Sequence, residues 1–249
     1  MTEGVTLAAE KIGSIGSFPI TNSLLTTWLV TAILITFAFI ATRRVALVPS
    51  SLQNFAEFAV ESLQNLVASV AGERTKVFFP IIASFFFFII VGNYLGLLPG
   101  VGTIGFYEQS AINHEKVFIP LFRSINSDLN TTLALAIVSV ITTHYFAIKY
   151  LGIKDYLKKW FPLSPIMLFV GLIELAGEFT KVISLSFRLF GNIYAGETVL
   201  YTASSKLFAF IVPIPFLSLE LIVGFVQALV FAMLTLVFMV ILTEKHDEH

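Results

Sequence analysis

The sequence predicts an all-α, polytopic integral membrane protein. Of its 249 residues 57% are hydrophobic and 12% are charged, and 26 are phenylalanine. Soluble domains carry about 25% charged residues, roughly twice as many. The mean hydropathy of +0.89 indicates more apolar surface than one globule of this size can bury. Several uninterrupted apolar runs are long enough to cross a bilayer, so we treat the whole chain as one membrane domain.

Composition also excludes several functions. The chain has no cysteine, which rules out disulfides, thiolate metal sites, iron–sulfur clusters and cysteine nucleophiles. A net charge of −1 and the lack of a long basic run argue against nucleic acid as a partner. No GxxxxGK[ST] phosphate loop is present, and His144 is the only histidine within a predicted span. We therefore expect no cofactor, no metal and no enzymatic active site, and we interpret His144 as a neutral or interface-facing side chain.

Three apolar runs predict ordinary, upright spans. They cover residues 23–41, 77–98 and 131–148, each long enough for a hydrocarbon core of ~30 Å at 1.5 Å per residue. Residues 50–70 place Phe55, Phe58 and Leu66 at helical spacing, with Glu57 and Glu61 on other faces. That pattern predicts an amphipathic helix at the membrane interface. Residues 99–130 are expected to form a loop outside the bilayer, and residues 1–22, which lack signal-peptide features, an outside tail.

Lysine and arginine predict the orientation, because cytoplasmic flanks retain these residues. Eight of these residues flank the spans on one side. Four lie between the first two spans: Arg43, Arg44, Arg74 and Lys76. The other four lie after the third span, in a predicted cytoplasmic loop over residues 149–163: Lys149, Lys154, Lys158 and Lys159. We expect the N-terminus outside and the C-terminus in the cytoplasm.

The last third of the chain predicts a hairpin of two long, tilted helices over residues 164–201 and 207–242. An upright helix of 38 residues would be ~57 Å long, nearly twice the hydrocarbon thickness. No Pro or Asn-Gly turn near its middle supports two separate spans. In the second helix, Gly224 and the pair Pro213 and Pro215 are candidates for a bend.

Polar residues within this hairpin indicate an ion path, because ionised side chains at membrane depth are costly. Arginine cannot avoid this cost by losing its proton, so Arg188 is the sharpest case. Lys181, Ser184, Asn192 and Ala195 fall within about 40° of it on a helix. The alternative is that Arg188 reaches a lipid headgroup or pairs with an internal glutamate.

The acidic residues are distributed around both helices. Glu197 lies about 180° from Arg188 and ~13.5 Å along the helix, so the two cannot form a direct ion pair. Glu220 and Gln227 share one stripe of the second helix, where the alternative is helix–helix hydrogen bonding without transport. Glu174 and Glu178, one turn apart, either neutralise Lys181 or line a second aqueous access.

The residues also resemble a known family. The run Ser184-Leu-Ser-Phe-Arg-Leu-Phe-Gly-Asn-Ile-Tyr-Ala-Gly-Glu197 resembles subunit a of the membrane sector of F-type ATP synthases, in its bacterial and chloroplast forms. The downstream run from Gln227 to Thr235, Asp128-Leu-Asn-Thr-Thr-Leu-Ala-Leu135 and Gly92-Asn-Tyr-Leu-Gly-Leu-Leu-Pro99 are similar to it too. The match covers most of the chain from about Ser50 onward, and its Arg-Leu-Phe-Gly-Asn core is highly specific.

The resemblance implies a non-catalytic stator in a bacterial inner membrane, beside a rotating ring of small c subunits that each carry one carboxylate. It implies peripheral-stalk b subunits and other synthase subunits as further partners. Arg188 matches the family's ring-facing arginine. Asn192, Glu197, Glu220 and Gln227 match positions of the outside half-channel, and Glu174 one near the cytoplasmic half-channel. Many relatives pair an acid with a histidine where this chain has Glu197 and Glu220, so the order of proton transfer stays open.

Two other functions remain open at this stage. In a stand-alone proton-coupled transporter or channel, Arg188 would bind an anionic substrate near the midplane. In a purely structural scaffold, replacing Arg188 and Glu220 would leave proton flux intact.

Overall fold

A computed structural model describes residues 9–43, 46, 49–109, 116–160, 165–206 and 213–244. Within them the chain is mostly helical, and four helical segments are long and apolar enough to cross a membrane: α1 (Asn22–Thr42), the stretch Ser51–Gly96, α4 (Leu129–Leu151) and α7 (Pro213–Thr243). The prediction of an all-α polytopic membrane protein is confirmed.

The N-terminal helices are bounded by recognisable caps. α1 begins after Thr21, whose hydroxyl accepts a hydrogen bond from the Leu24 amide, and α2 (Ser51–Ala71) begins after Ser50, which caps it in the same way. α2 ends at Gly72, whose φ of 55° favours glycine. The short helix η1 (Gly72–Arg74) then leads into α3 (Thr75–Gly96). α2 leaves Phe55 and Phe58 exposed, as an interfacial helix requires.

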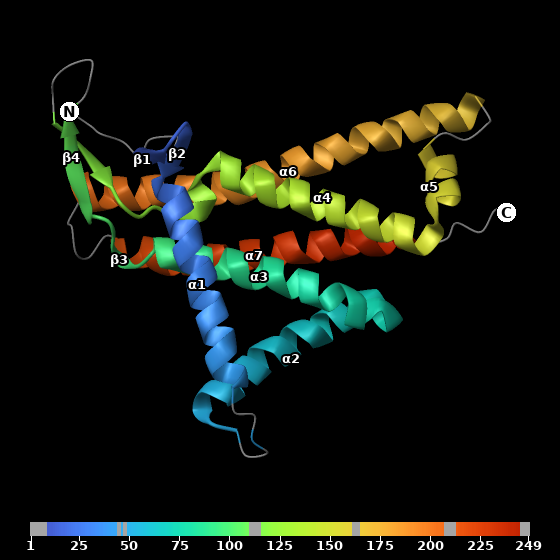
Figure 1. The fold of residues 1–249 in the computed structure, drawn as a ribbon, viewed down its shortest axis with the longest axis horizontal. Coiled ribbons are helices and arrows are strands. Elements are labelled where there is room, and N and C mark those ends of the chain that lie inside the picture. The colour runs from blue at the N-terminus through green and yellow to red at the C-terminus, as the bar shows by residue number, and fades with distance from the viewer. Residues whose placement is uncertain are drawn as a thin grey trace.

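Four helices form the main bundle. α3, α4, α6 (Pro165–Lys206) and α7 run alongside one another, whereas α1 crosses them and α2 diverges from them (Figure 1). The three segments predicted as upright spans therefore do not share one direction, because α3 and α4 follow the long helices. The core lies between these helices and includes the fully buried side chains Phe78, Ile82, Leu189, Phe231 and Leu236. The short helix α5 (Ile153–Trp160) closes one end of the bundle.

The long hairpin differs in detail from the expectation. α6 is continuous for 42 residues, about 63 Å at 1.5 Å per residue, and runs beyond residue 201 to Lys206. Residues 207–212, expected to begin the second helix, lie outside the described residues. Pro213 and Pro215 fall in the first turn of α7, where a missing amide hydrogen costs no helical hydrogen bond, so they do not bend the helix.

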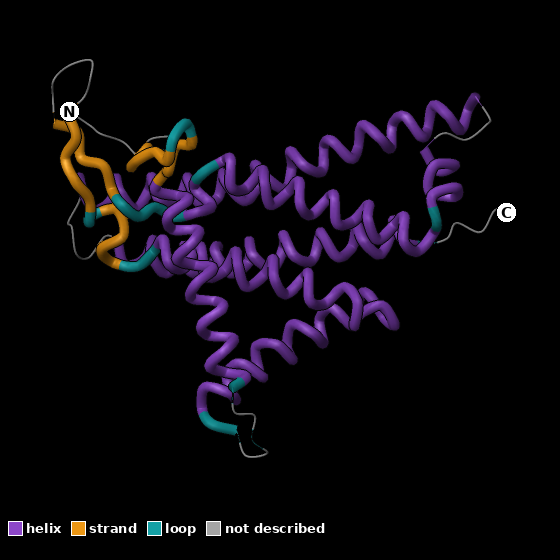
Figure 2. Tube along the Cα trace, viewed as in Figure 1, coloured by secondary structure: helices purple, strands orange, loops and turns teal. Residues whose placement is uncertain are grey.

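The segments expected to be an outside tail and an outside loop contain short strands, which were not predicted. β1 (Lys11–Ile15) pairs antiparallel with β2 (Phe18–Thr21) across a turn in which Gly16 has a φ of 63°. β3 (Pro99–Gly102) precedes an antiparallel pair of β4 (Gly105–Gln109) with β5 (Lys116–Pro120). These strands gather at the end of the bundle opposite α5 (Figure 2). Short runs of β-branched and aromatic residues between turn residues, as in β5, are the sequence pattern that indicates such strands.

The short helix η2 (Ile125–Ser127) connects the strands to α4. Asp128 caps α4 by accepting the Asn130 amide at 3.0 Å and also accepts the Ser23 hydroxyl of α1 at 2.6 Å. On α3, added Cβ atoms at Gly92 and Gly96 would overlap Ile125 and Ser124. The two glycines therefore let this segment approach α3 closely.

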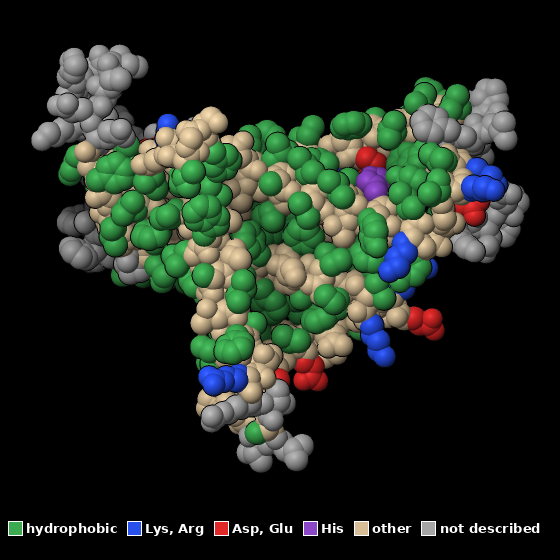
Figure 3. Space-filling model, in the orientation of Figure 1, with side chains coloured by type: hydrophobic (Ala, Val, Ile, Leu, Met, Phe, Trp, Pro, Cys, Tyr) green, Lys and Arg blue, Asp and Glu red, His purple; other side chains and the backbone are tan. Residues whose placement is uncertain are grey.

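In the face shown in Figure 3, most charged side chains lie at the end that carries α5 and along the lower edge, and the rest of the surface is predominantly hydrophobic. Lysines and arginines are prominent at the end that carries α5. A large apolar surface bordered by charged side chains is what contact with a hydrocarbon core requires.

Candidate functional site

Arg188 lies in the middle of α6 on a side that the rest of the chain leaves exposed. Its guanidinium donates a long hydrogen bond of 3.4 Å to the Ser184 hydroxyl one turn away. Among the described residues, no carboxylate lies within ion-pair distance of it. Added Cβ atoms at Gly177 and Gly191 would meet nothing within 4 Å, so the helix surface on this side is narrow and open. A permanent cation thus faces outward from a strip of small residues.

One turn beyond Arg188, α6 and α7 are joined by a polar contact. The Asn192 side-chain amide donates to the Gln227 carbonyl oxygen at 2.9 Å. Gln227 is 4% exposed, whereas Asn192 lies at the exposed edge. The helix–helix hydrogen bond considered for Gln227 is therefore present, and it lies next to Arg188 along the helix.

Glu220 of α7 is buried beneath Gly196 of α6. Its carboxyl group occupies the place where a Cβ at residue 196 would stand, so any larger residue there would displace this carboxyl group. Glu220 is 6% exposed, and its Oε1 has no hydrogen-bond partner within the described part of the chain. A buried polar atom without a partner is rare and calls for an explanation, such as a water or a transferable proton.

Glu197 points to the side of α6 away from Arg188, as its spacing predicts. It lies within electrostatic range of Arg123 and of Glu220, and it forms hydrogen bonds with the Ser127 side chain and the Ser124 backbone. Arg123 is 7% exposed and donates from Nε to the Ser127 hydroxyl at 3.0 Å. The two acids of the hairpin are therefore close enough to influence each other, although they lie on different helices.

Arg123 and the serines around it were not predicted as site residues, because they fall in a segment expected to be an outside loop. A buried amide pair was not predicted either. Asn126 donates to Asn93 Oδ1 at 2.7 Å, and Asn93 donates to the Gly224 carbonyl of α7 at 2.9 Å. The usable signal was Asn93 within the apolar run of α3. Asn126 had no comparable signal.

Glu174 lies apart from these residues. It is exposed on α6, fourteen residues before Arg188, about 21 Å along the helix and within about 40° of the same side. Glu178, and not Glu174, forms the ion pair with Lys181, at 2.6 Å. The structure thus brings together Asn192 with Gln227 and Glu197 with Glu220, all toward the strand end of the bundle, and leaves Glu174 toward the α5 end.

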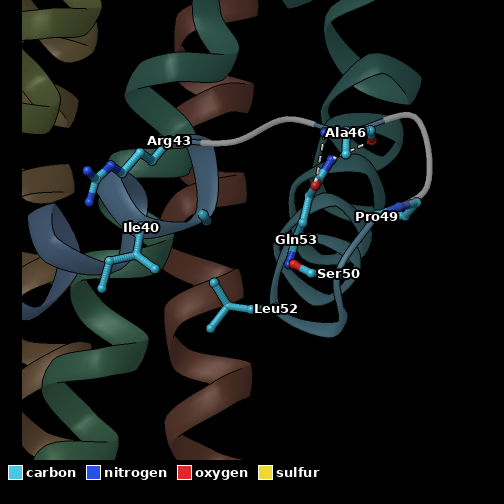
Figure 4. Close-up of a pocket in the computed structure, with 8 residues that line it drawn as sticks. Ile40, Arg43, Ala46, Pro49, Ser50, Leu52 and Gln53 are labelled. Atoms are coloured by element: carbon cyan, nitrogen blue, oxygen red, sulfur yellow. Dashed lines mark hydrogen bonds between the residues drawn. The ribbon is translucent and has the colours of Figure 1, made fainter.

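No group of three or more potential ligands that could hold a metal ion occurs in the described ranges. The surface pocket between the end of α1 and the start of α2 is remote from Arg188 in the chain and is lined mainly by Ile40, Arg43, Leu52 and Gln53 (Figure 4). Gln53 is engaged there by the Ala46 carbonyl at 3.2 Å and by Glu57 at 2.8 Å. In the described part of the hairpin, the polar groups that can act chemically therefore include the Arg188 guanidinium, the Lys181 ammonium and several carboxyl and amide groups.

Comparisons with known proteins agree on one family. The family described as ATP synthase A chain matches residues 24–240. A protein from Geotalea daltonii named ATP synthase subunit a is 36% identical over 216 residues, which cover 85% of this chain and 83% of the relative. The subunit a of Trichlorobacter lovleyi is 35% identical over 87% of this chain and 85% of its own length. That of Syntrophobacter fumaroxidans is 32% identical over 92% and 87%, respectively. With a match over most of its length, the chain belongs to the ATP synthase A chain family.

Proposed function

We propose that the protein is the stator subunit a of a rotary F-type ATP synthase and carries protons to and from the carboxylates of a rotating c-ring. The observation that carries this proposal is the position of Arg188 on an exposed side of α6 without a carboxylate partner among the described residues. An uncompensated cation at membrane depth is costly unless an anion reaches it.

The surroundings of Arg188 fit a helical partner. Gly177 and Gly191 leave open space on the same side of α6, and small residues allow another helix to approach closely. The exposed apolar side chains Ile183 and Phe187 lie in the same stretch of helix. A small hairpin subunit with a membrane-embedded carboxylate would supply both the helix and the anion.

The distribution of polar groups supports the proposal of two offset half-channels. Asn192, Gln227, Glu220 and Glu197 lead from Arg188 toward the strand end of the bundle, and we assign them to the half-channel that opens outside. Glu174, about 21 Å away in the other direction along α6, marks the half-channel that opens to the cytoplasm. Arg188 lies between the two.

This arrangement can couple ion flow to rotation. A ring carboxylate that nears Arg188 is favoured in its charged form, so it releases its proton into one half-channel. It is reprotonated from the other half-channel before it enters lipid, where a charge would be costly. The membrane field supplies ~2.3 kcal/mol per charge per 100 mV, and the separation of the half-channels turns this energy into rotation. The reaction on ATP takes place in other subunits.

The orientation and partners belong to the same proposal. We place the α5 end, with Arg74, Lys154 and Lys158, in the cytoplasm of a bacterium and the strand end outside its inner membrane. This puts the N-terminus outside and the C-terminus in the cytoplasm. Peripheral-stalk b subunits hold the stator against the torque of the ring.

The composition of the complex tests this function. The tagged protein, extracted from its own membranes with a mild detergent, should co-purify with a ring of small hydrophobic subunits and with ATPase activity. Recovery of the protein alone or as a homo-oligomer, with proton-coupled uptake of an anion after reconstitution, would instead support the stand-alone transporter.

A further inference from the structure

A second charged cluster lies toward the α5 end of the bundle and has no part in the function proposed above. We call it the Glu178 cluster; it comprises His144 of α4, Tyr156 of α5, and Glu178 and Lys181 of α6. Lys181 Nζ lies 2.6 Å from Glu178 Oε1, and His144 Nε2 lies 3.6 Å from Glu178 Oε2. The Tyr156 hydroxyl lies 3.0 Å from His144 Nδ1.

Glu178 is the central and most buried charge of this cluster, with 8% of the residue exposed. Its two carboxylate oxygens contact two different basic side chains, Lys181 on the same helix and His144 on α4. Trp160 packs edge-on against His144, and the Lys181 ammonium lies 4.6 Å from the centre of the Phe238 ring of α7. The charged groups that act on His144 are Glu178 and Lys181 alone among the described residues.

Lys181 shares the side of α6 that carries Arg188. Seven residues separate them, which is about 20° around the helix and ~10.5 Å along it. Ser184 lies between them, within about 40° of Arg188. Lys181 is therefore the cation nearest to Arg188 on this side of α6 in the direction of the α5 end.

We infer that Glu178 is a positioning residue whose carboxylate balances the positive charge of Lys181, so that Arg188 is the uncompensated cation of this strip. His144 is a second, protonatable partner of the same carboxylate. The inference rests on the proposed function, because it gives the strip a role in proton transfer. No bond is made or broken beyond the reversible protonation of His144.

The sign of the effect follows from the charges. With His144 neutral, Glu178 and Lys181 cancel; with His144 protonated, the cluster carries one positive charge. Loss of the Glu178 carboxylate leaves Lys181 uncompensated at every pH. In a partly solvated protein, a unit charge at a distance of ~10 Å shifts the electrostatic energy of a proton. The size of this shift corresponds to about a tenfold change in the rate of proton transfer. Acidification of the α5 side should therefore slow proton movement along this strip.

The test uses the assembled synthase in inverted vesicles, with ATP-driven acidification measured per assembled complex. Glu178→Gln should lower the rate about tenfold, and the double variant Glu178→Gln with Lys181→Gln should restore it. Asp155→Asn is the matched control, because it removes a carboxylate from an exposed Lys158 pair of similar spacing, and it should have no effect. His144→Gln should pump at the wild-type rate at alkaline pH and lose the decline seen in the wild type as the α5 side is acidified.

Normal pumping by Glu178→Gln, or a double variant as slow as the single one, overturns the inference. A purely structural ion pair would lower the amount of assembled complex and leave the rate per complex and its pH profile unchanged. If the Glu178→Gln complex does not assemble, the pH dependence of pumping by His144→Gln is the test. A pH dependence identical to that of the wild type overturns the inference. A wild-type complex that does not pump, or that lacks a ring, would instead refute the proposed function.

Discussion

Replacing Gly196 with alanine should impair transport without unfolding the protein. The new Cβ would overlap the Glu220 carboxyl group, which must withdraw by more than about 1 Å to reach a contact distance of ~3.5 Å. Because the obstacle is the end of a flexible side chain, the loss of stability should stay below the ~1–3 kcal/mol typical of overpacked cores. Misplacing a reacting group by about 1 Å can lower a rate on the order of 100-fold, and we expect a loss approaching that size in proton pumping.

The assay is ATP-driven acidification of inverted vesicles, with subunit content and thermal stability measured in parallel. Glu220→Asp in the Gly196→Ala background shortens the obstructing side chain by one methylene and should recover part of the rate. Gly13→Ala is the control, because a Cβ there meets nothing within 4 Å. Wild-type pumping by an assembled Gly196→Ala complex would refute the role assigned to Glu220 and its position.

Three further predictions address docking, stability and orientation. Gly191→Leu places a bulky side chain in open space, so the chain itself should remain stable while less ring co-purifies with it. Asn93→Leu leaves a buried amide donor without its partner and should destabilise the protein by about 1–3 kcal/mol, seen as a lower midpoint of thermal denaturation. Because the chain has no cysteine, single thiols report topology: Thr103→Cys should react with an impermeant reagent outside intact cells, and Lys154→Cys should react only in inverted vesicles.

The helices were predictable because their signal is local. Apolar runs of sufficient length determine which segments can cross a bilayer, and a 42-residue α6 cannot stand upright in one. Local reasoning could not predict that α1 crosses the bundle while α3 and α4 follow α6 and α7, because helix direction depends on packing between elements. The hairpins β1–β2 and β4–β5 were missed because their runs are short and lie among glycines.

In the candidate site, the positions of residues around a single helix were predictable from the sequence. Helical spacing alone places Glu197 opposite Arg188 and places Lys181 on the Arg188 side. Contacts between different helices do not follow from the spacing of residues within one helix, so the sequence did not predict them. The position of Gly196 over Glu220 and the proximity of Arg123 to Glu197 become visible only in three dimensions. For Glu174 and Glu178 the sequence left open either an ion pair with Lys181 or a second aqueous access, and the structure shows the ion pair for Glu178.

The central claim is that Arg188 acts as a permanent charge facing the ring, and its replacement tests this most directly. The measurement is ATP-driven acidification by inverted vesicles that contain the assembled complex with an intact ring. Arg188→Ala should abolish pumping, because nothing then drives the ring carboxylate to release its proton. Arg188→Lys should also fail, since an ammonium is more strongly hydrated and can lose its proton when buried. Gln227→Ala, which removes only a neutral amide from the adjacent contact, should weaken pumping without ending it. Normal acidification by Arg188→Ala vesicles would contradict the account and favour an arginine that merely reaches a lipid headgroup.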